Sequence, residues 1–143
     1  MTKSFTLNIP GTPVAQPRHR ISTRGGYAKT YLPKDHPIHA FKQAIALQAA
    51  GGGLFSGPVE VSIVAWFPMP SSWSKKKRKQ HEWRWHTQKP DGDNLAKAVL
   101  DALKEHWNDD CQVAMLTVRK RWHSGAGLTE IRVSEIQEDV GSE

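Results

Sequence analysis

Two short acidic stretches stand out in a chain whose other charged segments are mostly basic. Asp91 and Asp93 are two residues apart, and the adjacent pair Asp109 and Asp110 follows after one predicted helix. In a turn or extended conformation the first two carboxylates can converge on one ion. The second pair joins them if the next strand starts at the same edge of the sheet. Three carboxylates with water suit Mg²⁺, a hard cation that keeps several waters and accepts a phosphate oxygen.

A lysine accompanies these acids. Lys97 lies one helical turn after Asp93, and Asp101 lies one further turn along the same face. This face is opposite the apolar stripe that begins with Leu95 and Val99, so we expect Lys97 to project away from the core. A fixed positive charge there would lie near a bound phosphate, whose negative charge increases during hydrolysis.

The same residues have a purely structural explanation. Asp-Gly-Asp-Asn is good turn chemistry, and Asp93 is placed to cap the following helix. An exposed pair formed by Lys97 and Asp101 needs no function. Short acidic motifs of this kind are often coincidental, so the motif alone leaves both explanations open.

The remaining charge pattern predicts an anionic partner. The formal net charge is +6 and the pI is about 9.6, which favours DNA or RNA. A basic insert at about 74–88 contains Lys75, Lys76, Lys77, Arg78, Lys79 and Arg84. A second basic cluster, in the N-terminal loop, includes Arg18 and Arg20, although scattered charge on a surface loop would look the same. Such cations neutralise backbone phosphates, and with the acidic group they favour cutting nucleic acid over only binding it.

Three tryptophans accompany the basic insert. Trp73, Trp83 and Trp85 could stack on unpaired bases or wedge into a distorted duplex. They could equally hold the insert against the core. The sequence does not decide between these roles.

Apolar periodicity predicts the elements that position these residues. Strands are expected at 4–9, 59–67, 112–122 and 128–136, with a short one at 27–32, and helices at 37–49 and 94–106. The glycine-containing segment 123–127 predicts a hairpin between the last two strands. We therefore expect an α/β (α+β) fold with a single mixed β-sheet of about four to five strands packed with two main helices. Residues 1–137 would form one domain, and 138–143 a flexible acidic tail.

The composition also indicates the compartment. Cys111 is the only cysteine, so a reducing cytoplasm is expected, with this residue buried and unreactive. No apolar stretch approaches the roughly 20 residues of a membrane span, and no signal peptide is visible.

These residues resemble the RusA family of Holliday-junction resolvases, which occurs in bacteria and their prophages. The resemblance spans most of the chain, from the opening strand and the basic loop at 16–20, through 89–103, to the run Asp109-Asp110-Cys111-Gln112-Val113. An acid-x-acid-Asn-Leu-x-x-Lys run followed by Asp-Asp-x-Gln-Val is far more specific than either half.

The resemblance implies a small homodimeric, Mg²⁺-dependent endonuclease that nicks two opposing strands of a four-way DNA junction in recombination and repair. Family members use three aspartates and one lysine. Asp91, Asp93 and Asp110 match the metal-binding aspartates, and Lys97 matches the lysine. Mn²⁺ is expected to substitute for Mg²⁺. The dimer also follows from symmetry, because two identical sites related by a two-fold axis would match the paired cleavage points of a junction.

The residues alone lead only to a metal-dependent nuclease or a DNA-binding protein, and junction specificity comes from the resemblance. Two alternatives remain open. One is a non-catalytic protein that binds junctions or single strands and whose acids only cap and turn. The other is a metal nuclease acting on other branched nucleic acids or on RNA.

Overall fold

A four-stranded mixed sheet forms the centre of the computed structural model, which describes residues 3–17, 20–22, 29–31 and 34–137. The strands are β1 (Ser4–Pro10), β4 (Val59–Pro68), β5 (Val113–His123) and β6 (Leu128–Glu135), in the order β1-β6-β4-β5. β6 is antiparallel to both of its neighbours, whereas β4 and β5 are parallel. The predicted mixed α+β fold is therefore confirmed. A separate two-stranded piece joins β2 (Arg20–Ser22) to β3 (Lys29–Tyr31), and the predicted tail, 138–143, lies outside the described residues.

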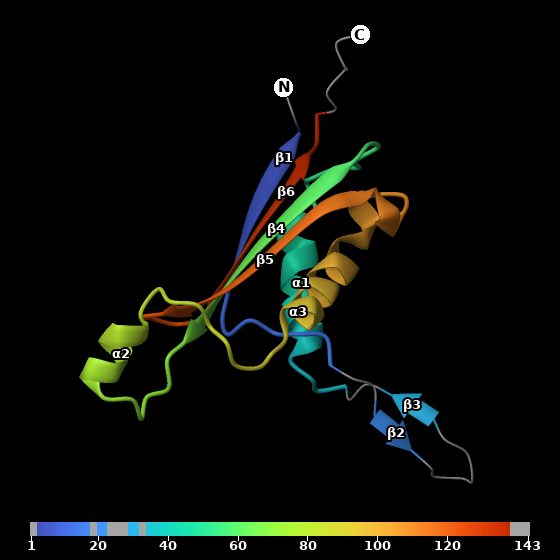
Figure 1. Ribbon diagram of the computed structural model, residues 1–143. Helices are drawn as coiled ribbons and strands as arrows, with labels where there is room; N and C mark the ends of the chain where they lie inside the picture. The colour runs from blue at the N-terminus through green and yellow to red at the C-terminus, as the bar shows by residue number, and fades with distance from the viewer. Residues whose placement is uncertain (1–2, 18–19, 23–28, 32–33, 138–143) are drawn as a thin grey trace.

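Two helices of equal length cover one face of the sheet. α1 (Ile38–Ala49) and α3 (Gly92–Leu103) lie on the same side in Figure 1. Strand alternation explains why this face needs a cover, because every second residue of β4 from Val59 to Phe67 is buried. Within the described part of the chain, no helix is long and apolar enough to cross a membrane.

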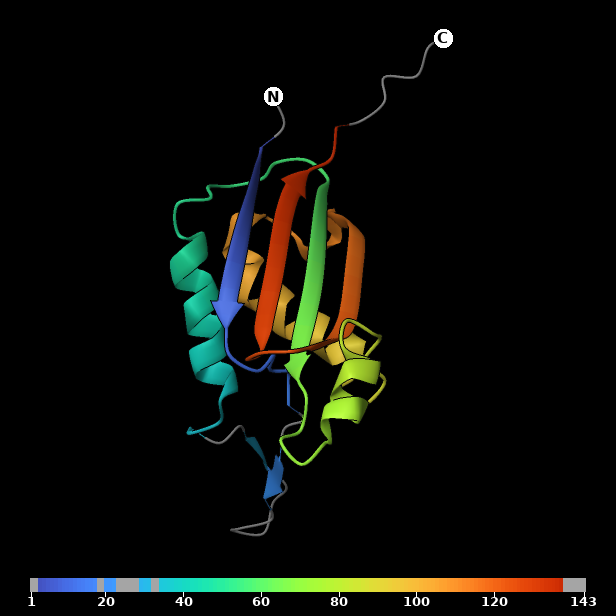
Figure 2. The same cartoon turned by 90° about the vertical axis from the view of Figure 1, so that its left-hand side faces the viewer.

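The short helix α2 (Lys75–His81) stands apart from this layer, at the end of the sheet where β4 finishes (Figure 2). A second, smaller core joins this end of the sheet to α3. It consists of Ala65, Phe67, Met69, Leu95 and Trp122. Trp73 is half-buried and packs against this core, so the basic insert begins from a fixed point.

The predicted hairpin between the last two strands is wrong. β5 and β6 are consecutive in sequence, but β4 lies between them and pairs with both. The crossover through α3 returns the chain to the starting end of β4, so β5 must run parallel to it. β6 then occupies the other side of β4, between β4 and β1.

Candidate active site

The N-terminus of α3 presents the first candidate carboxylate. The helix begins at Gly92, two residues earlier than predicted, and its N-cap is Asp91 rather than Asp93. Asp91 has an extended backbone and is exposed, yet its side chain makes no capping hydrogen bond. The structural explanation for this residue therefore loses its main support, and the carboxylate is available to a ligand.

Asp93, Lys97 and Asp110 share one groove along α3. Its volume is about 390 Å³, and Leu100 and Leu116 are among its other lining residues. Asp93 lies in the first turn of the helix and accepts a hydrogen bond of 3.0 Å from the backbone N–H of Asn94. The structure thus brings together three of the four predicted catalytic residues.

Lys97 forms no ion pair within the described residues. Asp101, its predicted helical partner, instead pairs at 2.5 Å with Lys42 of α1. That hydrogen bond lowers the pKa of Asp101 and ties the two helices together. The ammonium group of Lys97 therefore stays free to meet an anion in the groove.

The two adjacent aspartates after α3 have different roles. Asp109 begins the 3₁₀ helix η3 (Asp110–Gln112) with a capping box: its carboxylate accepts from the Cys111 N–H at 3.0 Å, and Gln112 Oε1 accepts from the Asp109 N–H at 3.0 Å. This hydrogen bond from Cys111 lowers the pKa of Asp109. Among the described residues, Asp110 accepts a side-chain hydrogen bond only from the indole of Trp107, at 3.2 Å, and it lines the groove. Asp109 is therefore the helix cap and Asp110 the candidate metal ligand. The sequence spacing of the two aspartates does not distinguish these roles.

Cys111 was expected to be buried, and this expectation is wrong, because its side chain is exposed beside the Asp109 cap. Its interaction with the Asp109 carboxylate raises the pKa of the thiol. A protonated thiol is a poor nucleophile, so the expectation of an unreactive residue agrees with this shift.

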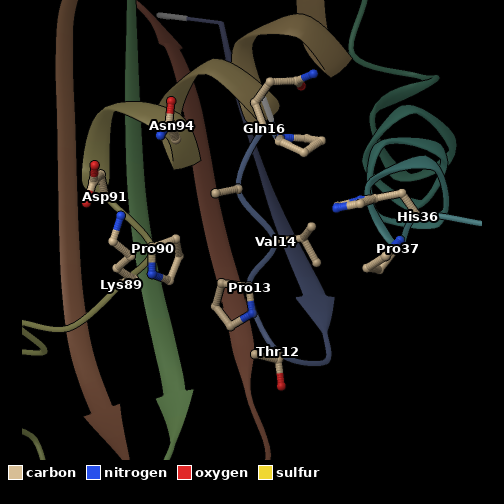
Figure 3. Close-up of a pocket in the computed structure, with 12 residues that line it drawn as sticks. Thr12, Pro13, Val14, Gln16, His36, Pro37, Lys89, Pro90, Asp91 and Asn94 are labelled. Atoms are coloured by element: carbon tan, nitrogen blue, oxygen red, sulfur yellow. The ribbon is translucent and has the colours of Figure 1, made fainter. Parts of the chain in front are cut away.

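Asp91 lines a second cavity, of about 750 Å³, which shares no lining residue with the groove. It is lined by residues 12–17, 36–37 and 89–91 and by Asn94. Figure 3 shows Lys89, Pro90 and Asp91 on one side and His36 on the other. Within the described residues, no three Asp, Glu, His or Cys side chains are grouped closely enough to hold a metal ion. The three-carboxylate metal site accordingly stays a prediction.

The sequence left open whether the two acidic groups meet at one edge of the sheet, and the structure places them next to different parts of β5. Asp110 precedes Val113, which pairs with the first residue of β4. Gly92 lies near Val118 in the middle of β5, where an added Cβ would be 3.8 Å from the valine side chain. Five strand residues span about 17 Å. The start of α3, with Asp91, therefore lies beside the middle of β5, whereas Asp110 lies just before the start of that strand.

Lys120 is a neighbour of Asp91 that the sequence analysis missed. Its ammonium group donates a hydrogen bond of 2.6 Å to the Gln88 carbonyl. Burial lowers the pKa of Lys120, and the negative charge of Asp91 opposes this effect. The basic run 119–121 inside a strand was the available signal, but its meaning depends on α3 lying against β5.

Comparison with known proteins identifies the family. Residues 10–134 match the family described as Endodeoxyribonuclease RusA. The chain belongs to this family. It is 36% identical to the Bacillus subtilis (strain 168) protein named "Uncharacterized protein YqaN" over 138 residues, which cover 91% of this chain and 95% of that protein. It is also 24% identical to the crossover junction endodeoxyribonuclease rusA of Lactococcus phage r1t over 119 residues, covering 82% and 76% of the two chains.

The predicted DNA-binding residues of this RusA-family chain fall into three groups. Lys75, Lys76, Lys77, Lys79 and Arg84 are exposed. Arg78 turns inward, where it donates to the Pro70 carbonyl at 3.0 Å and anchors α2. Arg18 lies outside the described residues, and Arg20 is described only as the first residue of β2.

The insert of this RusA-family chain is anchored by buried aromatic rings. His86 is 6% exposed, stacks on Phe67 with ring centroids 3.9 Å apart, and packs against Trp122 at 4.4 Å. Burial, with help from the charge of Lys120, lowers the pKa of His86 to about 4. The imidazole is therefore neutral at pH 7 and acts as a packing residue.

Proposed function

We propose that this RusA-family chain is a metal-dependent endodeoxyribonuclease that resolves four-way DNA junctions by paired, symmetric nicks near the crossover. The observation that carries the proposal is the groove along α3. Asp93, Lys97 and Asp110 line it, and none of the three forms an ion pair within the described residues. The exposed basic insert supports DNA as the substrate.

The donor chemistry of this site suits Mg²⁺. That ion usually keeps several waters and uses one or two protein carboxylates plus a substrate phosphate, so a preformed cage of three ligands is not needed. Asp93 and Asp110 would hold it in the groove, with Asp91 two residues from Asp93 at the helix N-cap. When bound there, Mg²⁺ supplies an activated water and screens the charge of the phosphate. Mn²⁺, which also accepts oxygen ligands, is proposed as a substitute.

The protein's own residues supply binding and charge. Lys97 would stabilise the negative charge that develops on the phosphate or on the leaving oxygen, leaving a 5′-phosphate and a 3′-hydroxyl. Lysines of α2 and Arg84 would hold the DNA arms through their phosphates, which gives affinity with little sequence information. Arg18 and Arg20 are proposed to add to this grip.

A homodimer completes the proposal. Junction cleavage points are related by two-fold symmetry, and a C₂ pair of sites would match them. Sedimentation analysis of the free protein tests this part separately, because a monomer at concentrations that support cutting would contradict it.

The proposal is tested with a synthetic four-way junction and a linear duplex of the same strands. Wild type and Asp91→Asn are each incubated with them in Mg²⁺ and in EDTA. We expect symmetric nicks in the junction only with wild type and Mg²⁺, while the variant still binds. Tight binding without a metal-dependent cut would favour a non-catalytic binding protein. Equal cutting of the duplex would remove the junction preference.

A further inference from the structure

The segment that follows α2 is pinned to the free edge of β5. The backbone N–H of Trp83 donates to the Trp122 carbonyl at 3.1 Å, and the Trp122 N–H donates to Arg84 at 2.9 Å. One step further, the His86 N–H donates to the Lys120 carbonyl at 2.9 Å. These bonds extend the sheet locally, so the residue between Arg84 and His86 has a fixed position.

That residue is Trp85, whose ring is held but not covered. It is 57% exposed, and the guanidinium of Arg121 lies 3.8 Å from its ring centroid. Arg121 is itself held, because its Nη1 donates to the Trp83 carbonyl at 2.7 Å. Trp85 also pairs with Arg121 through an isolated antiparallel bridge. The indole is thus a rigid platform backed by a cation, and it makes no contact with another aromatic ring of the described residues.

The other tryptophans are occupied. Trp107 and Trp122 are buried, and Trp73 packs against the smaller core. Trp66 donates a hydrogen bond to Glu130 and meets the ring of Trp83 edge-on, with centroids 5.4 Å apart at 83°. Of the six tryptophans in the sequence, Trp85 is therefore the one that combines large exposure with no aromatic partner among the residues that the structure describes.

The backbone around the platform is strained. Trp83 has φ of 69°, and it is the sole non-glycine residue with a positive φ in the described ranges. L-residues with bulky side chains disfavour this region, and such strain persists only where the surroundings fix it. Here the surroundings are the bonds to β5 and the ring of Trp66. Two residues later, Trp85 pairs with Arg121 of β5.

The positive charge around Trp85 indicates what kind of partner its exposed ring binds. α2 contributes exposed lysines, and Arg84 adjoins Trp85 directly. Glu82 is the single acidic residue between 74 and 88. Stacking rings beside cations are how proteins bind unpaired bases and the adjoining phosphates. An apolar protein partner would not need this density of positive charge.

We propose that Trp85, backed by Arg121, is a stacking platform for one unpaired nucleobase at the branch point of the DNA, with the adjoining phosphates held by α2 and Arg84. This inference rests on the proposed function for its ligand, because it needs branched DNA to be bound. It does not require that the DNA be cut.

The test compares binding to an intact junction with binding to junctions that carry one abasic nucleotide, placed in turn at each position around the crossover. All measurements are made in EDTA. One stacked base contributes about 1–3 kcal/mol, so wild type should lose about 5- to 150-fold in affinity at one position. Trp85→Ala should lose a similar factor on the intact junction and nothing further at that abasic position. Trp85→Phe should retain most of the affinity.

Two matched comparisons separate stacking from charge and from folding. The double variant Lys76→Ala/Lys79→Ala should lose equal affinity for intact and abasic junctions, because phosphates are present in both. Circular dichroism checks that Trp85→Ala stays folded, as expected for an exposed side chain.

Three results would overturn the platform. The first is an affinity of Trp85→Ala for the intact junction equal to that of wild type, which would favour a protein partner for the exposed ring. The absence of any sensitive abasic position is the second. The third is a loss in Trp85→Ala that adds to the abasic loss, since independent losses exclude a shared contact. Junction cutting that survives any of these results would leave the proposed function standing, whereas failure of wild type to bind the junction would remove both.

Discussion

The ammonium group of Lys120 donates a hydrogen bond of 2.6 Å to the backbone carbonyl of Gln88, three residues before Asp91. This bond fixes the segment that leads into α3 against β5. Because the charge of Asp91 also acts on Lys120, the lysine couples the strand to the candidate site electrostatically as well as by geometry.

Lys120→Met should lower the single-turnover nicking rate by about 10²-fold, because small displacements of a catalytic group have effects of that size. The matched control is Arg119→Met, whose side chain points to the opposite face of the sheet by strand alternation. Its nicking rate at saturating protein should match that of wild type. Equal rates for Lys120→Met and wild type would show that the Gln88 bond does not position the site.

The adjacent aspartates provide a second matched pair. Asp110→Asn should reduce nicking by at least about 100-fold, since residues one step removed from a metal already contribute 10–100-fold. Asp109→Ala should keep the nicking rate and lower the melting temperature, because it removes the side-chain oxygen that accepts from the Cys111 N–H. Thermal melts and nicking assays on both variants check this. The reverse pattern would mean that the two roles are exchanged.

Lys97 and Lys42 form a third pair. Lys97→Met removes the groove lysine that is proposed to act on the phosphate and should reduce nicking by about 10²–10³-fold, the effect of losing one group that stabilises developing charge. Lys42→Met breaks only the partly exposed ion pair with Asp101, so it should lower the free energy of unfolding by no more than about 1 kcal/mol. Its nicking rate should be unchanged. Similar nicking by the two variants would argue against a role for Lys97.

His86 should make stability depend on pH. Its pKa is lowered from 6.5 to about 4, so between these values the unfolded chain binds more protons than the folded chain. The contribution of His86 to the free energy of unfolding is fully present above pH 6.5 and is lost as the pH falls towards 4. Its magnitude is roughly 3 kcal/mol. Urea unfolding of wild type and His86→Phe at several pH values measures it.

In His86→Phe this slope should disappear while stability at pH 7 is kept. Phenylalanine can maintain the stack on Phe67, and Nδ1 of His86 has no hydrogen-bond partner to lose among the described residues. An unchanged slope in the variant would mean that another group titrates in this window.

Local pattern was enough to predict most of the elements. The alternation of Val59–Phe67 and the helical stripe from Leu95 to Leu103 are each decided by burial of one face, and both predictions are confirmed. The hairpin after β5 was wrong for a physical reason: a glycine-containing turn favours a local reversal, but it does not determine which strand fills the neighbouring position. β4 takes that position through pairing between residues 55 apart in sequence, such as Val61 with Leu116.

In the candidate site, too, local sequence patterns were predictive and features that depend on the tertiary structure were not. Spacing and the family resemblance selected Asp91, Asp93, Lys97 and Asp110. The different roles of Asp109 and Asp110 could be assigned only from the capping box, because that box is recognised by its hydrogen bonds. Lys120 could not be assigned in advance, because its proximity to Asp91 depends on the parallel arrangement of β4 and β5 around α3.

Resolution of a cruciform extruded from a supercoiled plasmid tests the central proposal most directly. Paired incision of the junction by wild type in Mg²⁺ should convert the plasmid to the linear form, with nicks at symmetric positions. Asp91→Asn in Mg²⁺, and wild type in EDTA, should leave it supercoiled. Accumulation of open circles with unrelated nick positions, or linear product from the variant, would contradict a junction resolvase that depends on this aspartate.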